Sequence, residues 1–231
     1  MAPDVRAVWR SPWFDRFGAA TYDLFVERER LARVGALLLW GTDARLLYRS
    51  LAAISGAPDG SAILDVPCGG GVAFRALRPE QRVRYVAADL SPGMLRRARS
   101  ESERRGLRQI ALIEADVEAL PFDDASFDLS VCLNSLHCFA DPAAALREIG
   151  RCLRPGGRLI GDAAVRGRGA RFDFTIRLYE RRGIFGPGGT AADVERWLAD
   201  AGFEQVRLRL SGAVAYFEAL LGGGSGRGGS Q

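Results

Sequence analysis

The stretch that decides the fold is Ile63-Leu64-Asp65-Val66-Pro67-Cys68-Gly69-Gly70-Gly71. Apolar residues run into an acid and then into a glycine cluster, a pattern typical of a buried parallel strand followed by a tight turn. We expect a helix to open directly behind the turn, at Val72 to Leu77. Glycines at such a turn let the backbone approach a ligand closely, and the N–H groups at a helix start are free to bind it.

A second apolar run, Val83 to Ala88, ends in Asp89. An acid at the tip of the second strand is where a doubly wound nucleotide-binding fold holds two ribose hydroxyls. Further apolar runs predict three more strands, at Ile110 to Glu114, Phe127 to Leu133 and Arg158 to Ala164. Helical segments separate these strands, and the alternation predicts an α/β fold with a parallel sheet.

The C-terminal part predicts a helix followed by a hairpin. Thr190 is a suitable N-cap for a helix over Ala191 to Ala201. Phe203 to Leu210 and Ala213 to Ala219 read as two strands joined by Ser211-Gly212. We expect the Gly- and Ser-rich residues 222–231 to form a disordered tail.

The N-terminal part is helical in pattern. We expect Met1 to Pro12 to be loose, and an amphipathic helical segment from Trp13 to about Arg49, interrupted at Gly41-Thr42-Asp43 before a helix over Ala44 to Ser55. The predicted organisation is therefore a helical cap over residues 1–55, which belongs to the same domain as the sheet, and the main α/β unit over residues 56–221.

Four motifs, in order, resemble those of class I S-adenosylmethionine-dependent methyltransferases. They are the glycine turn from Asp65 to Gly71, the third-strand motif from Glu114 to Phe122, the fourth-strand entry Ser126-Phe127-Asp128, and the loop Leu153-Arg154-Pro155-Gly156-Gly157-Arg158-Leu159. The segment from Phe14 to Asp23 is similar to the lead-in of the quinone-biosynthesis-type, small-molecule branch. The resemblance implies a Rossmann-like, doubly wound sheet of seven strands, mostly parallel, with a C-terminal antiparallel hairpin. It also implies S-adenosyl-L-methionine as cofactor and in-line methyl transfer to a small-molecule acceptor.

The same resemblance assigns the cofactor-binding residues. Asp65 would orient the glycine turn or meet the amino end of the cofactor, and Asp89 would bind the ribose. Asp116 would accept from the adenine amine. The other residues assigned to the cofactor are Pro67, Cys68, Gly69, Gly71, Leu90, Met94, Val117, Asn134 and Tyr22. Pro67 departs from the glycine of the family pattern, and proline fixes φ and removes an N–H group.

Structural interpretations of several of these residues stay open. Leu90 and Met94 would look the same as ordinary core residues, and Tyr22 would look the same packed into a helical cap. Asp116 could cap the following turn, and Asp65 could cap the backbone behind it.

His137 is the only histidine of the chain and follows the predicted fourth strand, at the edge of the sheet where ligands sit in open α/β folds. An imidazole there could take a proton from an acceptor hydroxyl or amine near neutral pH. A structural role for a single histidine is the alternative, because alignment alone is sufficient for many methyl transfers.

Composition limits the remaining possibilities. A net charge of +4, with 32 basic residues (all arginine) spread among 28 acids, does not indicate a nucleic-acid partner. The longest apolar run, Val34 to Trp40, is too short to span a membrane. The four cysteines lack metal-like spacing, so we expect neither a metal site nor disulfides. Their use as small buried residues predicts a cytoplasmic location. Nothing in the composition indicates the oligomeric state.

Two other functions fit part of the pattern. A dinucleotide-dependent oxidoreductase would share the glycine turn and the ribose acid, but it would not explain Glu114 to Phe122 or the terminal hairpin. A methyltransferase-like protein that binds the cofactor without transferring a methyl group would fit the departure at Pro67. The sequence does not identify the acceptor.

Overall fold

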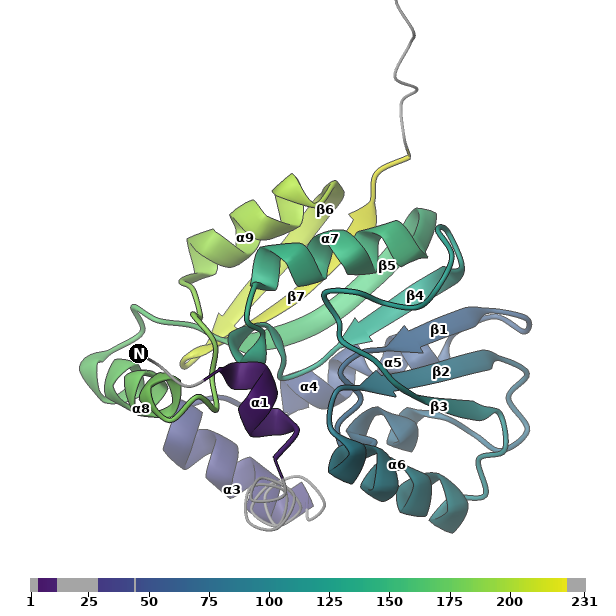
Figure 1. Ribbon diagram of the computed structural model, residues 1–231, viewed down its shortest axis with the longest axis horizontal. Coiled ribbons are helices and arrows are strands. Elements are labelled where there is room, and N and C mark those ends of the chain that lie inside the picture. The colour runs from purple at the N-terminus through teal and green to yellow at the C-terminus, as the bar shows by residue number, and fades with distance from the viewer. Residues whose placement is uncertain (1–3, 12–28, 44, 224–231) are drawn as a thin grey trace, which may run out of the picture.

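The computed structural model describes residues 4–11, 29–43 and 45–223. Tyr22 and the whole lead-in segment from Phe14 to Asp23, which resembles the quinone-biosynthesis branch, lie outside the described residues. The described residues of the chain form one sheet with helices on both of its faces (Figure 1).

The sheet has seven strands in the order β3-β2-β1-β4-β5-β7-β6. The first five pair in parallel, and β7 pairs antiparallel with β5 and β6. This arrangement confirms the predicted doubly wound sheet with a terminal antiparallel hairpin. The strand order reverses between β1 and β4, the position where ligands bind in open α/β folds. The strands are β1 (Ala62–Asp65), β2 (Arg84–Asp89), β3 (Ile110–Glu114), β4 (Phe127–Cys132), β5 (Leu153–Ala164), β6 (Phe203–Ser211) and β7 (Val214–Leu221).

Alternate strand residues supply two separate cores. Leu64 packs on one face with α7 (Pro142–Cys152) and α9 (Ala191–Asp200). Its neighbour Ile63 packs on the other face with α5 (Ala52–Ser55) and α6 (Pro92–Arg104). Because successive side chains of a strand point to opposite faces, the almost continuously apolar β1 and β2 are explained by burial on both sides.

Several predicted boundaries were wrong. The predicted helix behind the glycine turn is a short 3-10 helix, Val72–Ala76, and it ends one residue earlier than predicted because Leu77 has an extended conformation. The hairpin link is Gly212-Ala213, one residue later than predicted, because Ser211 still pairs with Val214. The helix predicted over residues 44–55 is divided into α4 (Arg45–Ser50) and α5.

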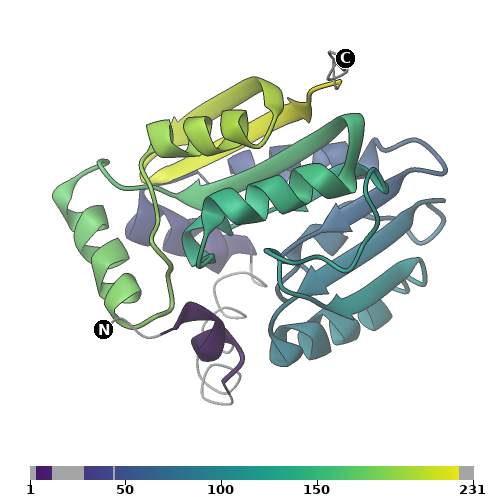
Figure 2. The same ribbon diagram turned by 45° about the horizontal axis from the view of Figure 1, so that its top comes forward.

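The N-terminal helices lie at the end of the sheet where β1 and β2 terminate. Part of the segment expected to be loose forms a short helix, α1 (Val5–Trp9), which Asp4 caps by accepting from the Arg6 N–H. The two views show α1 between α6 and α8 (Ala170–Arg181), with α3 (Glu29–Trp40) close by (Figures 1 and 2). Trp9 Nε1 donates to the Ile184 carbonyl over 3.0 Å, which fixes α1 to the loop after α8.

No helix within the described residues is long and apolar enough to cross a membrane.

Candidate functional site

A cavity of about 570 Å³ lies at the carboxyl ends of the central strands. Its wall includes Gly69 behind β1, Asp89 at the end of β2, Asn134 behind β4 and Asp162 on β5. Trp9 of α1 and Trp40 of α3 form part of the opposite wall. The volume is in the range of sites that hold drug-sized ligands.

Asp89 is the acid that the fold places at the tip of β2. Its side chain is buried, lines the cavity, and accepts from the Gly69 N–H over 2.9 Å and the Ser91 N–H over 2.8 Å. Burial raises the pKa of Asp89 to about 6, although these backbone donors work in the opposite direction. Each carboxylate oxygen can accept more than one hydrogen bond, so Asp89 can both hold the glycine turn and receive hydroxyl groups from the cavity.

The glycine turn has two residues in the left-handed region, Gly69 at φ 53° and Gly71 at φ 88°. A Cβ at Gly71 would also come within 2.6 Å of the Phe74 ring, so this position requires glycine for both reasons. Pro67 and Gly69 line the cavity, whereas Cys68 is buried in the core under the turn. Cys68 and Gly71 are not among the lining residues.

Asp116, behind β3, lies on the cavity wall with Val117. Its Oδ1 accepts from the Glu118 N–H over 3.0 Å, and its Oδ2 is 2.8 Å from Arg6 Nε of α1. Arg6 also pairs with Glu118. Asp116 therefore caps the following turn, as one interpretation expected, while its carboxylate also faces the site.

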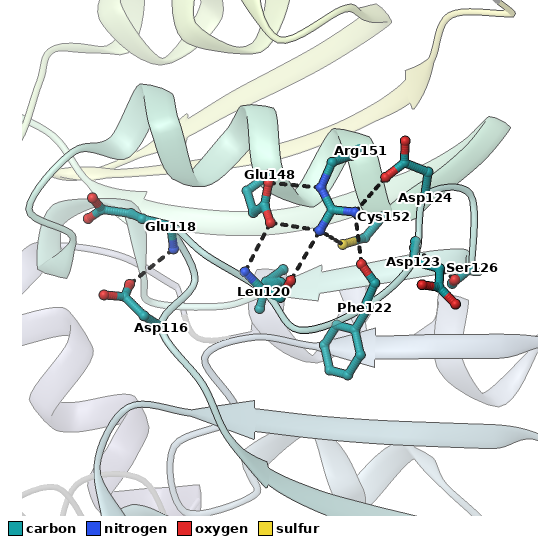
Figure 3. A network of polar contacts seen from close by, with 10 residues as sticks. All are labelled: Asp116, Glu118, Leu120, Phe122, Asp123, Asp124, Ser126, Glu148, Arg151 and Cys152. Atoms are coloured by element: carbon teal, nitrogen blue, oxygen red, sulfur yellow. Dashed lines mark hydrogen bonds and ion pairs between the residues drawn. The ribbon is translucent and has the colours of Figure 1, made fainter.

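The loop that carries Asp116 is held from the far side by α7 (Figure 3). Arg151 donates to the carbonyl oxygens of Leu120 and Phe122 over 3.1 and 2.8 Å, and Glu148 accepts from the Leu120 N–H over 3.0 Å. Arg151 and Glu148 also form an ion pair of 2.7 Å, which lowers the pKa of Glu148. These contacts hold the backbone at Leu120 and Phe122, four and six residues after Asp116.

Asp65 lies under the site without facing it. Its Oδ2 accepts from the Tyr85 hydroxyl over 2.9 Å, both side chains are buried, and Asp65 is not among the lining residues. Burial raises the pKa of Asp65 to about 8, and the hydrogen bond from Tyr85 opposes that shift. The hydrogen bond from Tyr85 to Asp65 links the side chains of β2 and β1.

His137 lies in the short 3-10 turn Leu136–Cys138 behind β4 and is buried. Its Nδ1 accepts from the Ala164 N–H over 3.0 Å, so a neutral ring carries its proton on Nε2. The ring contacts Phe185 edge-on at 4.3 Å between centroids, and burial lowers the pKa of His137 to about 3. The structure does not place His137 among the residues that line the cavity.

The half of the cavity beyond β4 and β5 has aromatic walls. Trp40 and Phe185 stack at 6.1 Å between centroids, and Tyr179 packs against Phe185 at 5.0 Å. Tyr216 of β7 shares a hydrogen bond of 2.9 Å with the Thr42 hydroxyl. The other half, around Asp89 and Asp116, contains Leu90 and Met94, which also line the cavity.

Asp162 is the acid of the aromatic half. It is 5% exposed, and its Oδ1 accepts from the Asn134 N–H over 3.2 Å. Its Oδ2 is buried and has no hydrogen-bond partner among the described residues. Burial raises the pKa of Asp162 to about 7, and the Asn134 N–H opposes that shift.

Sequence reasoning missed Asp162, Arg6 and the aromatic wall. Asp162 lies two residues before the end of the predicted fifth strand, Arg158 to Ala164, so the position of an acid near the ligand edge was a usable signal. Arg6 lies in a segment too short to show helical periodicity, and the aromatic residues come from three separate elements.

The described residues contain no group of three or more His, Cys, Asp or Glu side chains that could hold a metal ion.

Comparison with known proteins agrees with this geometry. Residues 64–161 match the methyltransferase domain family. The chain is 40% identical over 126 residues to the demethylmenaquinone methyltransferase of Thermus thermophilus, a match that covers 54% of this chain and 56% of that protein. The chain spans about half or less of the length of the curated relatives that it matches.

Solved structures share the fold. A SAM-dependent methyltransferase from Aquifex aeolicus superposes with a TM-score of 0.59 at 20% identity, over 81% of this chain and 93% of that one. The [4+2]-cyclase SpnF superposes with a TM-score of 0.65 at 19% identity, over 97% of this chain and 98% of that one. The fold and the site therefore define a class I methyltransferase fold. Residues 64–161 match the methyltransferase domain family, and this part of the chain is similar to methyltransferases named for quinone biosynthesis.

Proposed function

We propose that this protein transfers a methyl group from S-adenosyl-L-methionine to a small, largely apolar acceptor. The observation that carries the proposal is the buried carboxylate of Asp89, which lines the cavity at the tip of β2 and accepts from the glycine turn. A ribose with two adjacent hydroxyls is the group that this carboxylate would bind.

The residues around Asp89 fit the rest of the cofactor. Leu90, Met94 and Val117 offer apolar surfaces for adenine, and Asp116 Oδ1 and Oδ2 offer acceptors for its amine. Gly69 brings the backbone to the cavity on the side where the methionine part would lie. The absence of an N–H group at Pro67 leaves fewer backbone donors there than the family pattern supplies.

The cofactor, when bound, supplies an electrophilic methyl group. The protein's own contribution is alignment of the acceptor and exclusion of water, which supply much of the rate enhancement of such displacements. Trp9, Trp40 and Phe185 line the cavity and would keep water from the reacting atoms. In this proposal His137 positions the turn behind β4, because its Nδ1 is occupied by the Ala164 N–H.

The class of acceptor is inferred from the cavity and from the relatives. The half beyond β4 and β5 presents aromatic rings from Trp40, Tyr179 and Phe185, which suit a flat apolar molecule. The relative from Thermus thermophilus is named for demethylmenaquinone, a quinone. We infer that this chain acts on a quinone-like or similar aromatic acceptor, and that the helices before β1 form a cap over the bound molecules.

Calorimetry with S-adenosyl-L-methionine and its demethylated product tests the proposal. We expect both to bind, and we expect S-adenosyl-L-methionine to bind more tightly than NAD. No binding of either compound to folded protein would contradict the proposed cofactor.

Transfer itself needs a separate measurement, because SpnF carries the same fold and is named for a cyclisation. Incubation with methyl-labelled cofactor and a panel of quinols and phenols should give a labelled product. Tight cofactor binding without any labelled product would favour the alternative, a cofactor-binding protein that does not transfer the methyl group.

A further inference from the structure

We propose that Asp162 is the group that receives the acceptor hydroxyl, taking its proton through the otherwise unbonded Oδ2. The inference deepens the proposed function and rests on it for the identity of the reaction. It assigns to the acceptor a hydroxyl, most simply a phenol, on a flat apolar frame.

The position of Asp162 carries the proposal. It pairs with Tyr216 across β5 and β7, and residues directly opposite in an antiparallel pair point to the same face. Both side chains line the cavity. Asp162 therefore lies in the aromatic half, separated from Asp89 by the strand ends of β1 and β4.

The hydrogen bonding of Asp162 indicates that a ligand is its missing partner. Buried carboxylate oxygens in proteins are almost always hydrogen-bonded, because burial without a partner is costly. Oδ1 is satisfied by the Asn134 N–H, whereas Oδ2 has no partner among the described residues. The Tyr216 hydroxyl, which could have filled the place, is bonded to Thr42 instead.

A carboxylate in this position can act as a base. The proton leaves the acceptor hydroxyl and binds Oδ2, while the electron pair of the O–H bond stays on the acceptor oxygen, which becomes the nucleophile. Burial raises the pKa of Asp162 to about 7, so that the carboxylate matches the working range of a general base.

Of the neighbouring titratable groups, Tyr216, Cys132 and His137 do not change charge near pH 7, whereas the buried acids Asp65 and Asp89 do. Burial raises the pKa of Tyr216 on β7 and of Cys132 on β4 to about 12 each. Burial lowers the pKa of His137, behind β4, to about 3. Asp65 on β1, with a pKa of about 8, is the other buried acid whose charge raises the pKa of Cys132. A substitution of Asp65 is therefore the matched control for a substitution of Asp162.

The test compares two probes that differ in one hydrogen-bond donor, 2-naphthol and 2-methoxynaphthalene. Their binding is measured by calorimetry on the full chain saturated with the demethylated cofactor, and again without it. We expect the wild-type protein to bind 2-naphthol at least tenfold more tightly, and this preference to increase as the pH rises through 7. No binding of either probe, or equal binding of both, would overturn the proposal.

The variant Asp162→Asn keeps an oxygen for the Asn134 N–H and replaces Oδ2 by a donor. We expect its preference for 2-naphthol to fall below threefold at every pH, with binding of 2-methoxynaphthalene unchanged. Asp65→Asn, which alters a buried acid away from the cavity, should keep the preference. A preference that survives in Asp162→Asn would overturn the proposal.

The cofactor arm separates this inference from the proposed function. If Asp162→Asn instead weakens binding of the demethylated cofactor tenfold and leaves binding of 2-naphthol unchanged, Asp162 belongs to the cofactor site. The inference about Asp162 then fails, and the proposed function stands. If the naphthol preference is present but neither form of the cofactor binds the wild-type protein, the proposed function fails and the assignment of Asp162 as a hydroxyl-binding group stands.

Discussion

Arg6 Nε lies 2.8 Å from Asp116 Oδ2, and this ion pair joins α1 to the loop behind β3 across the cavity wall. Arg6 also pairs with Glu118, whose Oε1 accepts from the Asp141 N–H at the start of α7. A single side chain of α1 is thus bound to the loop that faces the proposed adenine position. The pair is partly exposed, so it contributes little to the stability of the whole fold.

Replacing Arg6 by alanine should release α1 from that loop. We expect the cofactor to dissociate about three- to tenfold faster, because a covering element that is held less often exposes the site more often. The melting temperature should change little, since exposed ion pairs contribute at most about 1 kcal/mol. Stopped-flow displacement of bound cofactor measures the rate, and Arg10→Ala, at the exposed end of the same helix, is the matched control.

Asp89→Ala should weaken binding of S-adenosyl-L-methionine at least tenfold. Hydrogen bonds to a charged carboxylate contribute about 1.5–3 kcal/mol each, and two ribose hydroxyls would lose their acceptor. The variant also leaves the N–H groups of Gly69 and Ser91 without their acceptor, so a lower melting temperature is expected. Calorimetry below the melting range separates the two effects, and unchanged affinity in the folded variant would disprove the assignment to the ribose.

The sequence was sufficient for the fold because β1 to β4 are short and mostly apolar, and because helix signals follow β1, β2 and β4. Val83 to Ala88 and Ile110 to Glu114 were predicted within a residue of β2 and β3. The acid at the end of β2 could be placed for the same reason, since topology alone brings Asp89 to the ligand edge.

The rest of the site depends on contacts between distant parts of the chain. Asp65 has the same local pattern as Asp89, yet it is turned into the core because Tyr85 donates to it. His137 looks like a reactive group in sequence, but the N–H of Ala164, on another strand, occupies its Nδ1. Local sequence patterns do not encode such partners.

The buried acids should make stability fall as the pH rises above neutrality. Burial raises the pKa of Asp65 to about 8 and of Asp162 to about 7, so the folded chain holds protons that the unfolded chain has lost. Stability is therefore greatest below the unfolded pKa and is lost as the pH rises toward the folded values. Asp65 alone should account for on the order of 2 kcal/mol between pH 6.5 and 8.5.

Urea unfolding at a series of pH values between 6.5 and 8.5 measures this slope. His137 is neutral in the folded chain throughout this range, and in the unfolded chain it is about half protonated at pH 6.5 and largely neutral above about pH 7. Asp65→Asn should flatten the slope, and the exposed Asp59→Asn should leave it unchanged. A slope that persists in Asp65→Asn and Asp162→Asn would show that neither acid is its source.

His137 should oppose the effect of the buried acids on the acid side of the same curve, without acting as a base. Burial lowers the pKa of His137 to about 3, so below about pH 6.5 the unfolded chain binds a proton that the folded chain does not bind. The contribution of His137 to stability should therefore fall as the pH drops from about 6.5 toward 3, against the increase that Asp65 and Asp162 produce down to about pH 4. His137→Asn can keep an acceptor for the Ala164 N–H, so this variant should remain folded at neutral pH and should gain stability relative to the wild type as the pH drops below about 6.5. His137→Leu removes the acceptor and should cost about 1–3 kcal/mol at neutral pH. Turnover of His137→Asn, once an acceptor is found, should stay within about a hundredfold of the wild type, because removal of a true general base costs 10²–10⁴-fold. A larger loss, together with disappearance of an ionisation near neutrality from the pH–rate profile, would make His137 the base and would remove that role from Asp162.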